Sequence, residues 1–258
     1  MNLSRRSFVK SSAAATLPAL LAANALPLVA AETTQKNARQ LKIVCVGGHP
    51  DDPESGCGGT LTRYAQAGHN VTIFYLTRGE RGIRDKGLDE SAKIRTAEAE
   101  AACKLIGAKA VFAGQIDGAT EMTQTRIGDF QKLLASEVPD ILFTHWPIDT
   151  HMDHQVASML TIRANMALRR RAELFFFEVD LGSQTHGFAP NTYVDISTVV
   201  EKKKSALFAH VSQDGQGIWR EHHQVMAEFR GREAGVRAAE AFVHLTRITP
   251  NSSLPGLG

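Results

Sequence analysis

Short apolar runs alternate with longer stretches of mixed character from residue 41 onward. The apolar runs predict strands at residues 42–46, 71–76, 110–112, 141–145, 174–178 and 192–196. The stretches between and after them predict helices at about residues 58–67, 89–105, 126–136, 154–170, 197–209 and 221–238. This alternation is typical of parallel strands joined by helical crossovers. We therefore expect an α/β domain with a mostly parallel sheet and a frayed tail after Thr249.

Glycines mark the ends of the first two predicted helices, at Gly68 and Gly107. In the second helix, apolar residues recur at the spacing of one helical face. That spacing predicts a buried stripe made of Ile94, Ala97, Ala101, Ala102 and Leu105.

The N-terminus is typical of an export signal rather than of the folded domain. Arg5 and Arg6 form a twin-arginine pattern, and the uncharged, alanine-rich run that follows is interrupted by Pro18 and Pro27. It resembles a bacterial Tat signal. We expect a signal at residues 1–31, cleaved before Glu32, with a second candidate junction after Ala25. A single domain at residues 32–258 would follow, located in the periplasm or outside the cell and without stable membrane insertion. An uncleaved anchor and a disordered tail are the alternatives.

Charge and cysteine content narrow the function classes. The full chain of 258 residues has a formal charge of +2, and residues 1–31 hold three basic residues and no acidic one, so the remainder has a charge of −1. No block of Lys or Arg favours nucleic acid or an anionic membrane as a partner. Cys45, Cys57 and Cys103 form no disulfide framework, and we expect them to pack in the core. For Cys57, which lies near the first polar motif, the alternative to core packing is a role as a metal ligand.

Two clusters of polar residues follow predicted strands. His49-Pro50-Asp51-Asp52 comes after the first strand, and His151-Met152-Asp153-His154 comes after the fourth. Ligands of open α/β sheets bind beyond the carboxyl ends of the strands, so the two clusters are expected to face one site. Imidazole nitrogen and carboxylate oxygen are ligands of Zn²⁺, and a catalytic zinc site uses three of them.

The residue types divide into metal ligands and catalytic groups. His49, Asp52 and His154 form the predicted ligand set, which leaves Asp51 as the general base that takes a proton from water. His151 is the candidate donor to a developing oxyanion. Asp153 is expected to hydrogen-bond His151 and orient it.

At these motifs the chain resembles the PIG-L family, also called LmbE-like N-acetylglucosaminyl deacetylases. Further matches are Gly58-Gly59-Thr60-Leu61, Thr77-Arg78-Gly79-Glu80, Arg95 with Glu98-Ala99, Tyr193-Val194-Asp195-Ile196 and Ala239-Glu240-Ala241-Phe242. The resemblance implies a Rossmann-like three-layer αβα sandwich. It also implies hydrolysis of an N-acetyl group from a glucosamine-type sugar or glycoconjugate by a zinc enzyme, with ferrous iron as the alternative metal. The oligomeric state stays open. One departure from the common pattern is Pro53, which stands where a glutamate usually follows the two aspartates, with Glu54 one position later.

Several polar residues have two interpretations. His145 is expected to be a structural histidine, and the pair His222-His223 to lie on the surface at a helix start. Arg78 and Arg84 either bind substrate or are surface charges, and His186 is a candidate cleft residue on a loop. The rival function is a metal-containing carbohydrate-binding protein without turnover. A nucleotide-binding enzyme is disfavoured, because Gly47-Gly48 is no GxGxxG fingerprint.

Overall fold

The computed structural model describes residues 39–179 and 184–245. Within these ranges one sheet has seven strands in the order β3-β2-β1-β4-β5-β7-β6. The strands are β1 (Lys42–Gly47), β2 (Asn70–Tyr75), β3 (Lys109–Phe112), β4 (Ile141–His145), β5 (Glu173–Phe177), β6 (Thr192–Asp195) and β7 (Ala239–His244). The strands from β3 to β5 pair in parallel, whereas β7 is antiparallel to both β5 and β6. The expected mostly parallel sheet is confirmed.

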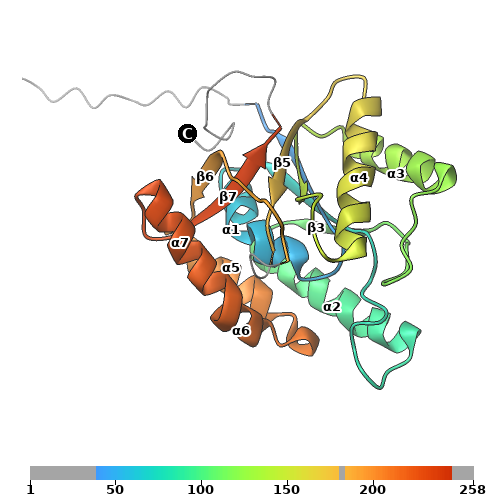
Figure 1. The fold of residues 1–258 in the computed structure, drawn as a ribbon, viewed down its shortest axis with the longest axis horizontal. Helices are drawn as coiled ribbons and strands as arrows, with labels where there is room; N and C mark the ends of the chain where they lie inside the picture. Colours follow the sequence, from blue (N-terminus) through green and yellow to red (C-terminus); the bar gives the residue numbers. More distant parts are fainter. Residues whose placement is uncertain (1–38, 180–183, 246–258) are drawn as a thin grey trace, which may run out of the picture. The chain divides into compact units, whose positions relative to one another are not determined.

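Helices cover both faces of the sheet (Figure 1). They are α1 (Asp52–Gln66), α2 (Leu88–Ile106), α3 (Gln124–Glu137), α4 (Met152–Ala167), α5 (Val200–Phe208) and α7 (Gln224–Ala234). Between α5 and α7 lie the short turns η1 (Val211–Gln213) and α6 (Gly215–Ile218) and the π-helical η2 (Trp219–His223).

The side chains of β1 alternate between two hydrophobic cores, as the period of a strand requires. Ile43 and Cys45 join the core formed with α1, α2, α5 and α7. Val44 and Val46 join the core formed with α3 and α4. The protein is thus a three-layer αβα sandwich of the Rossmann-like type.

Three sequence predictions differ from the structure. Strand β7 lies where no strand was predicted, and α7 ends at Ala234 rather than at residue 238. Helix α1 begins at Asp52, six residues before the predicted start at Gly58. The predicted buried stripe of α2 lies largely on the wrong face of the helix, because Leu105 is 47% exposed. The buried face of that helix is formed by Ser91, Ala92, Arg95, Ala99, Ala102, Cys103 and Ile106.

The strand order places a crevice between β1 and β4. The chain proceeds from β1 to β2 and β3 on one side and resumes with β4 and β5 on the other, so β1 and β4 are parallel neighbours at the point where the order reverses. Ligand sites of open α/β sheets form at such a point. Both polar clusters follow these two strands, as predicted.

The predicted signal at residues 1–31, its cleavage junction and the tail after Thr249 lie outside the described residues. Among the residues that are described, none of the helices has the length and apolar character needed to span a bilayer.

Candidate active site

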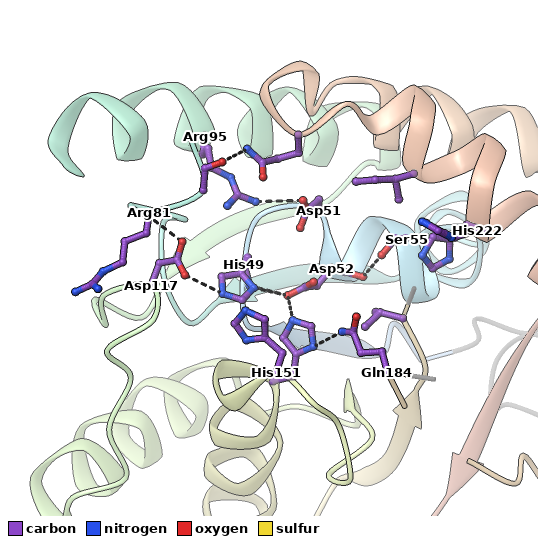
Figure 2. Close-up of a pocket in the computed structure, with 16 residues that line it drawn as sticks. His49, Asp51, Asp52, Ser55, Arg81, Arg95, Asp117, His151, Gln184 and His222 are labelled. Carbon is purple, nitrogen blue, oxygen red and sulfur yellow. Dashed lines mark hydrogen bonds and ion pairs between the residues drawn. The ribbon is translucent and has the colours of Figure 1, made fainter. Parts of the chain in front are cut away.

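A cavity of about 510 Å³ opens at the carboxyl ends of β1 and β4. His49, Asp51 and Asp52 line it from the loop after β1 and the first turn of α1, and His151 and His154 line it from the start of α4 (Figure 2). Residues separated by about a hundred positions therefore share one site. Asp153, the sixth predicted site residue, lies behind this wall and is fully buried.

One carboxylate oxygen connects the predicted metal ligands. Asp52 Oδ2 lies 3.2 Å from His49 Nδ1 and 3.3 Å from His154 Nε2. Ligands bound at about 2.0–2.1 Å in a tetrahedron are separated by about 3.4 Å, so both separations suit two edges of a zinc site. Burial would raise the pKa of Asp52, but His154 and His145 hold it well below its usual range. The carboxylate is thus ionised, as a ligand must be.

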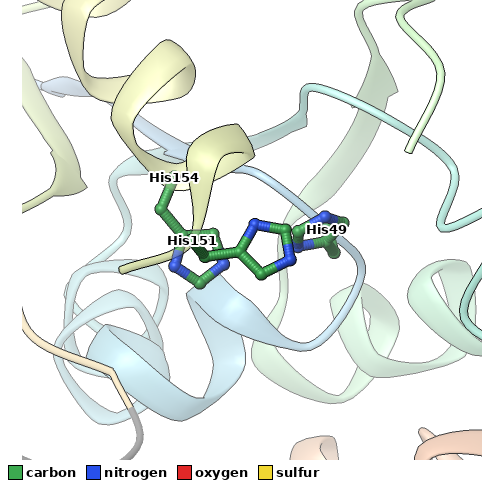
Figure 3. A group of neighbouring side chains, drawn as sticks. All are labelled: His49, His151 and His154. Atoms are coloured by element: carbon green, nitrogen blue, oxygen red, sulfur yellow. The ribbon is translucent and has the colours of Figure 1, made fainter. Parts of the chain in front are cut away.

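Three imidazole rings meet at the floor of the cavity (Figure 3). The His49 and His151 rings are 4.7 Å apart, those of His151 and His154 4.6 Å, and nitrogen atoms of all three lie within 4.8 Å of one another. A second group of candidate ligand atoms joins Asp52, His145 and His154.

His145 belongs to this site rather than to the core alone, which corrects its interpretation as only a structural histidine. Its ring stacks on His154 at 4.0 Å, and its Nε2 lies 3.3 Å from Asp52 Oδ2. The same Nε2 accepts the N–H of Gly48 at 3.0 Å, so its lone pair is already used. Burial, followed by the charge of His154, lowers the pKa of His145 to about 4. Because the N–H of Gly48 occupies this nitrogen, we place His145 behind the predicted ligands rather than among them.

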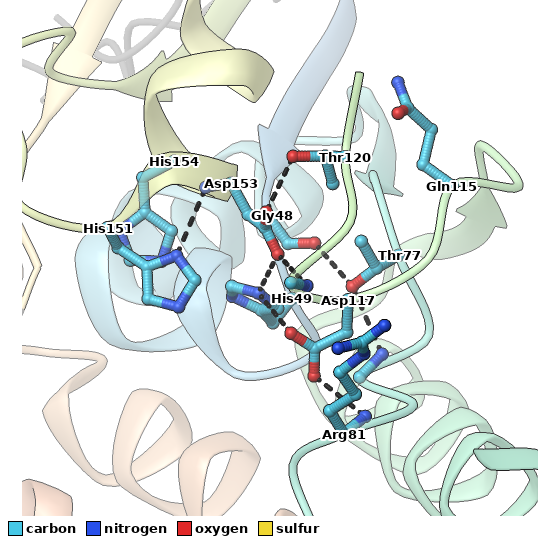
Figure 4. A network of polar contacts seen from close by, with 12 residues as sticks. Gly48, His49, Thr77, Arg81, Gln115, Asp117, Thr120, His151, Asp153 and His154 are labelled. Carbon is cyan, nitrogen blue, oxygen red and sulfur yellow. Dashed lines mark hydrogen bonds and ion pairs between the residues drawn. The ribbon is translucent and has the colours of Figure 1, made fainter.

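The carboxylate of Asp153 orients His49, not His151 as expected. Asp153 Oδ2 lies 3.0 Å from His49 Nε2 and accepts the N–H of Gly118 at 2.7 Å, while Oδ1 accepts the hydroxyl of Thr120 at 2.6 Å (Figure 4). These contacts direct His49 Nδ1 toward Asp52. A carboxylate on the distal nitrogen of a metal-ligating histidine fixes its tautomer and orientation.

Two further aspartates orient the histidines and were not predicted. Asp149 Oδ2 lies 3.1 Å from His154 Nδ1, and Asp117 Oδ1 lies 3.3 Å from His49 Nε2. Asp149 stands two residues before His151, so its position in the second motif was the available signal. Asp117 lies in the loop after β3, where no local pattern marks it.

Asp51 is held in an unusual backbone conformation at the start of α1. Its φ of 108° is in the region that favours glycine. The Asp51 N–H donates to Glu54 Oε2 at 3.2 Å, and Arg95 donates to Asp51 Oδ2 at 3.1 Å and to the carbonyl of Pro50. Burial raises the pKa of Asp51 to about 6 although Arg95 opposes that shift. A strained residue held by several contacts is typical of a functional position.

His151 is fixed by the helix that it starts. It is the N-cap of α4, and its Nδ1 accepts the N–H of Asp153 at 3.2 Å. In the neutral ring the proton then resides on Nε2, which can donate a hydrogen bond.

The remaining predicted residues divide between the cavity and the surface. His222 and His223 line the cavity, and His223 is buried, so their interpretation as surface residues is wrong. Arg78 contacts Glu80 at 3.2 Å. Arg84 and His186 are exposed and are not among the residues that line the cavity. The Sγ atoms of Cys57 and Cys45 lie 3.3 Å apart in the core, where Cys57 has a packing role.

Comparison with known proteins places this site in a family. The family described as GlcNAc-PI de-N-acetylase (PIG-L) matches residues 44–165, which include both polar clusters. A diacetylchitobiose deacetylase from Thermococcus kodakarensis is 31% identical over 217 residues, 77% of this chain and 81% of the relative. The chain belongs to the PIG-L family.

Two other similar proteins carry different activities in their names. The solved N,N'-diacetylchitobiose deacetylase from Pyrococcus horikoshii has a TM-score of 0.70 and 27% identity, covering 81% of this chain and 87% of that one. A 4-oxalmesaconate hydratase from Pseudomonas putida is 26% identical over 234 residues, 81% of this chain and 88% of the relative.

Proposed function

We propose that this chain is a metal-dependent hydrolase that removes an N-acetyl group from a glucosamine-type sugar or glycoconjugate. One observation supports this most: His49 Nδ1 and His154 Nε2 both lie close to Asp52 Oδ2. The neighbouring carboxylate, Asp51, does not belong to this predicted ligand set. Binding alone would need neither Asp51 nor His151. The deacetylase relatives support the N-acetylated sugar as the substrate class.

His49, Asp52 and His154 would hold the metal, zinc or ferrous iron. The donor set fits, because it combines two imidazole nitrogens with an ionised carboxylate, and both histidines have a carboxylate on their other nitrogen. When bound, the metal lowers the pKa of water from about 15.7 to about 7 and polarises the substrate carbonyl.

Asp51 would accept the proton from the attacking water and later deliver it to the amine that leaves. Its carboxylate lines the cavity beside Asp52, and the contacts of its backbone with Glu54 and of its side chain with Arg95 fix its direction. A positioned general base contributes about 10²–10⁴-fold to such a step. Arg95 donates to Asp51 Oδ2, and the carboxylate lines the cavity into which the attacking water would enter.

His151 would donate its Nε2 proton to the oxyanion that forms as the amide carbonyl is attacked. Its ring is 4.7 Å from that of His49 and lines the same cavity, so the donor would stand beside a carbonyl that is held near His49. A cavity of about 510 Å³ is in the range of small-molecule sites.

Acetate release tests the proposal directly. Purified protein is assayed on a panel of N-acetylated sugars, oligosaccharides and glycoconjugates, before and after removal of metal with a chelator. We expect close to one divalent ion per chain, acetate release that the chelator abolishes, and recovery when zinc or ferrous iron is added back. Sugar binding without acetate release would instead favour the non-catalytic carbohydrate-binding alternative. A His154→Ala variant that keeps its full metal content would contradict the ligand assignment.

A further inference from the structure

Helix α1 is two helical pieces joined at Cys57. The φ and ψ of Cys57 are −145° and 19°, far from helical values, and three glycines surround this break. The first piece carries Asp52 and Ser55 to the cavity, and the second packs on the sheet. The sequence predicted only the second piece, from Gly58, because the glycines hide the first.

The glycines let the break lie directly on neighbouring elements. A Cβ at Gly56 would lie 2.4 Å from the ring of Phe177, and a Cβ at Gly59 would lie 2.7 Å from Ile196. The backbone of α1 therefore touches the residues of β5 and the loop after β6 with no side chain between.

Glu240 of β7 caps the second piece. Its carboxylate accepts the N–H of Gly59 at 2.9 Å and of Thr60 at 2.7 Å. In an unbroken helix these two N–H groups would donate four residues back, to Ser55 and Gly56. A carboxylate at the N–H groups that start a helix satisfies them and favours the helix dipole.

Lys203 of α5 completes this arrangement. Its Nζ lies 2.6 Å from Glu240 Oε1, and both side chains are 3% exposed. Burying a Lys–Glu pair costs desolvation, and apolar replacements of such pairs are often neutral or stabilising. The pair is therefore a weak source of stability and is better explained by the specific geometry that it imposes on α1.

The cap is close to the active site. A void of about 20 Å³ is lined by Glu240 and Lys203 on one side and by Ser55 and His223 on the other, and the last two also line the large cavity. Only the break and the first turn of α1 separate the cap from Asp52.

We propose that Glu240, neutralised by Lys203, is a positioning residue that keeps the break in α1 and so sets the direction in which the first turn presents Asp52 to His49 and His154. Without the carboxylate, the N–H groups of Gly59 and Thr60 lose their acceptor, and the first turn is no longer held at its angle to the second piece. The inference rests on the proposed function only where it concerns metal affinity.

The test uses Glu240→Gln, which keeps the shape of the side chain but leaves one acceptor oxygen for two N–H groups. Hydrogen exchange of the metal-free protein should accelerate at residues 58–61 and also at residues 51–55. Zinc affinity, measured by chelator competition on the folded protein, should fall at least tenfold, and kcat should fall with little change in KM.

Two further variants keep this test decisive. Glu178→Gln removes one carboxylate of another pair, with Arg230 at 2.7 Å; Glu178 borders the same small void, but among the described hydrogen bonds it accepts only from Arg230 and from no N–H of α1. This variant should lose stability as Glu240→Gln does, but its zinc affinity should stay within twofold of the wild-type value. The double variant Lys203→Met/Glu240→Gln removes both buried charges, so it should recover stability while zinc affinity remains low.

Acceleration confined to residues 58–61, or zinc affinity restored in the double variant, would overturn the positioning role. If the wild-type protein bound no metal and released no acetate, the proposed function would fail. Hydrogen exchange at residues 51–55 would still show whether Glu240 positions the first turn of α1.

Discussion

Asp51 combines two features that few residues share, a left-handed backbone and a buried carboxylate that lines a cavity beside its neighbour Asp52. Adjacent aspartates would normally be interchangeable. Here Glu54 and Arg95 fix the direction of Asp51, whereas three histidines surround Asp52. The different surroundings support the proposed division, in which Asp51 transfers the proton and Asp52 binds the metal.

The first prediction concerns this division. Asp51→Asn keeps the size of the side chain but removes the base, so turnover should fall about 10²–10⁴-fold while metal content stays near wild type. Steady-state acetate release and metal analysis on the same preparation measure both. Asp52→Asn is the matched variant and should lose the metal. Equal turnover in Asp51→Asn and wild type would remove Asp51 as the base.

The second prediction concerns the carboxylate behind His49. Asp153→Asn should weaken zinc binding about 10–100-fold, because an amide orients the imidazole less strongly and does not raise its basicity. Chelator competition gives the dissociation constant. Asp140→Asn, a buried aspartate at the opposite ends of the strands, is the control and should leave that constant unchanged. Unaltered affinity in Asp153→Asn would show that Asp153 does not support His49 as a metal ligand.

At this scale the sequence predicted which residues come together better than it predicted their contacts. Both motifs follow strands, so the proximity of His49, Asp52 and His154 could be inferred from their positions. The partner of Asp153 could not, because its contact with His49 depends on how the loop through Gly118 and Thr120 folds against α4.

Some helices and strands of this protein depend on close contacts between backbone segments. A pattern of apolar residues along the sequence does not reveal such contacts. Strand β7 contains a buried glutamate, Glu240, and begins with helix-favouring alanines, so it lacks the apolar run that identified the other strands. Its identity is set by pairing with β5 and β6, which are distant in sequence.

The third prediction compares two glycines in helices. Gly56→Ala places a methyl group 2.4 Å from Phe177, and we expect it to reduce the free energy of unfolding by about 1–3 kcal/mol. Gly128→Ala in α3 meets nothing within 4 Å and should raise that free energy by about 0.5–1 kcal/mol, because alanine loses less backbone entropy. Denaturant unfolding measures both. Equal effects would mean that α1 does not rest on Phe177.

The fourth prediction concerns the start of β4. Asp140 accepts the N–H of Lys42 at 3.0 Å and contacts Arg170 and Arg39, which joins β1 to β4. Burial would raise the pKa of Asp140, but the Lys42 N–H and then the two arginines lower it. The ionised form therefore stabilises the fold above the unfolded pKa of about 3.9, and this stabilisation is lost as the pH falls.

Asp140→Asn should accordingly cost about 1–2 kcal/mol at pH 7, with the difference from wild type narrowing below about pH 4. Denaturant unfolding across pH 3–8 measures it. The exposed Asp129→Asn should differ from wild type by less than about 0.5 kcal/mol throughout. A difference that did not change with pH would exclude a charge effect.

For the molecule as a whole, the twin-arginine pattern leads us to propose export by the Tat pathway to the periplasm or beyond. The fifth prediction is that Arg5→Lys/Arg6→Lys retains the protein in the cytoplasm, while the wild-type protein is recovered outside it with Glu32 as its first residue. Cell fractionation and N-terminal sequencing measure these outcomes. Export of the double variant would contradict the assignment.

The place of β7 in the sheet has a consequence for biosynthesis. This strand is translated after all the others but lies between β5 and β6, and β6 pairs with no strand except β7 among the described residues. Glu240, which caps the second piece of α1, leaves the ribosome at the same late moment. A nascent chain that stops before Ala239 therefore has both histidine motifs but neither a finished sheet nor a capped α1. Synthesis of β7 thus precedes assembly of the site, and a chain truncated before β7 exposes unpaired strand edges that favour aggregation.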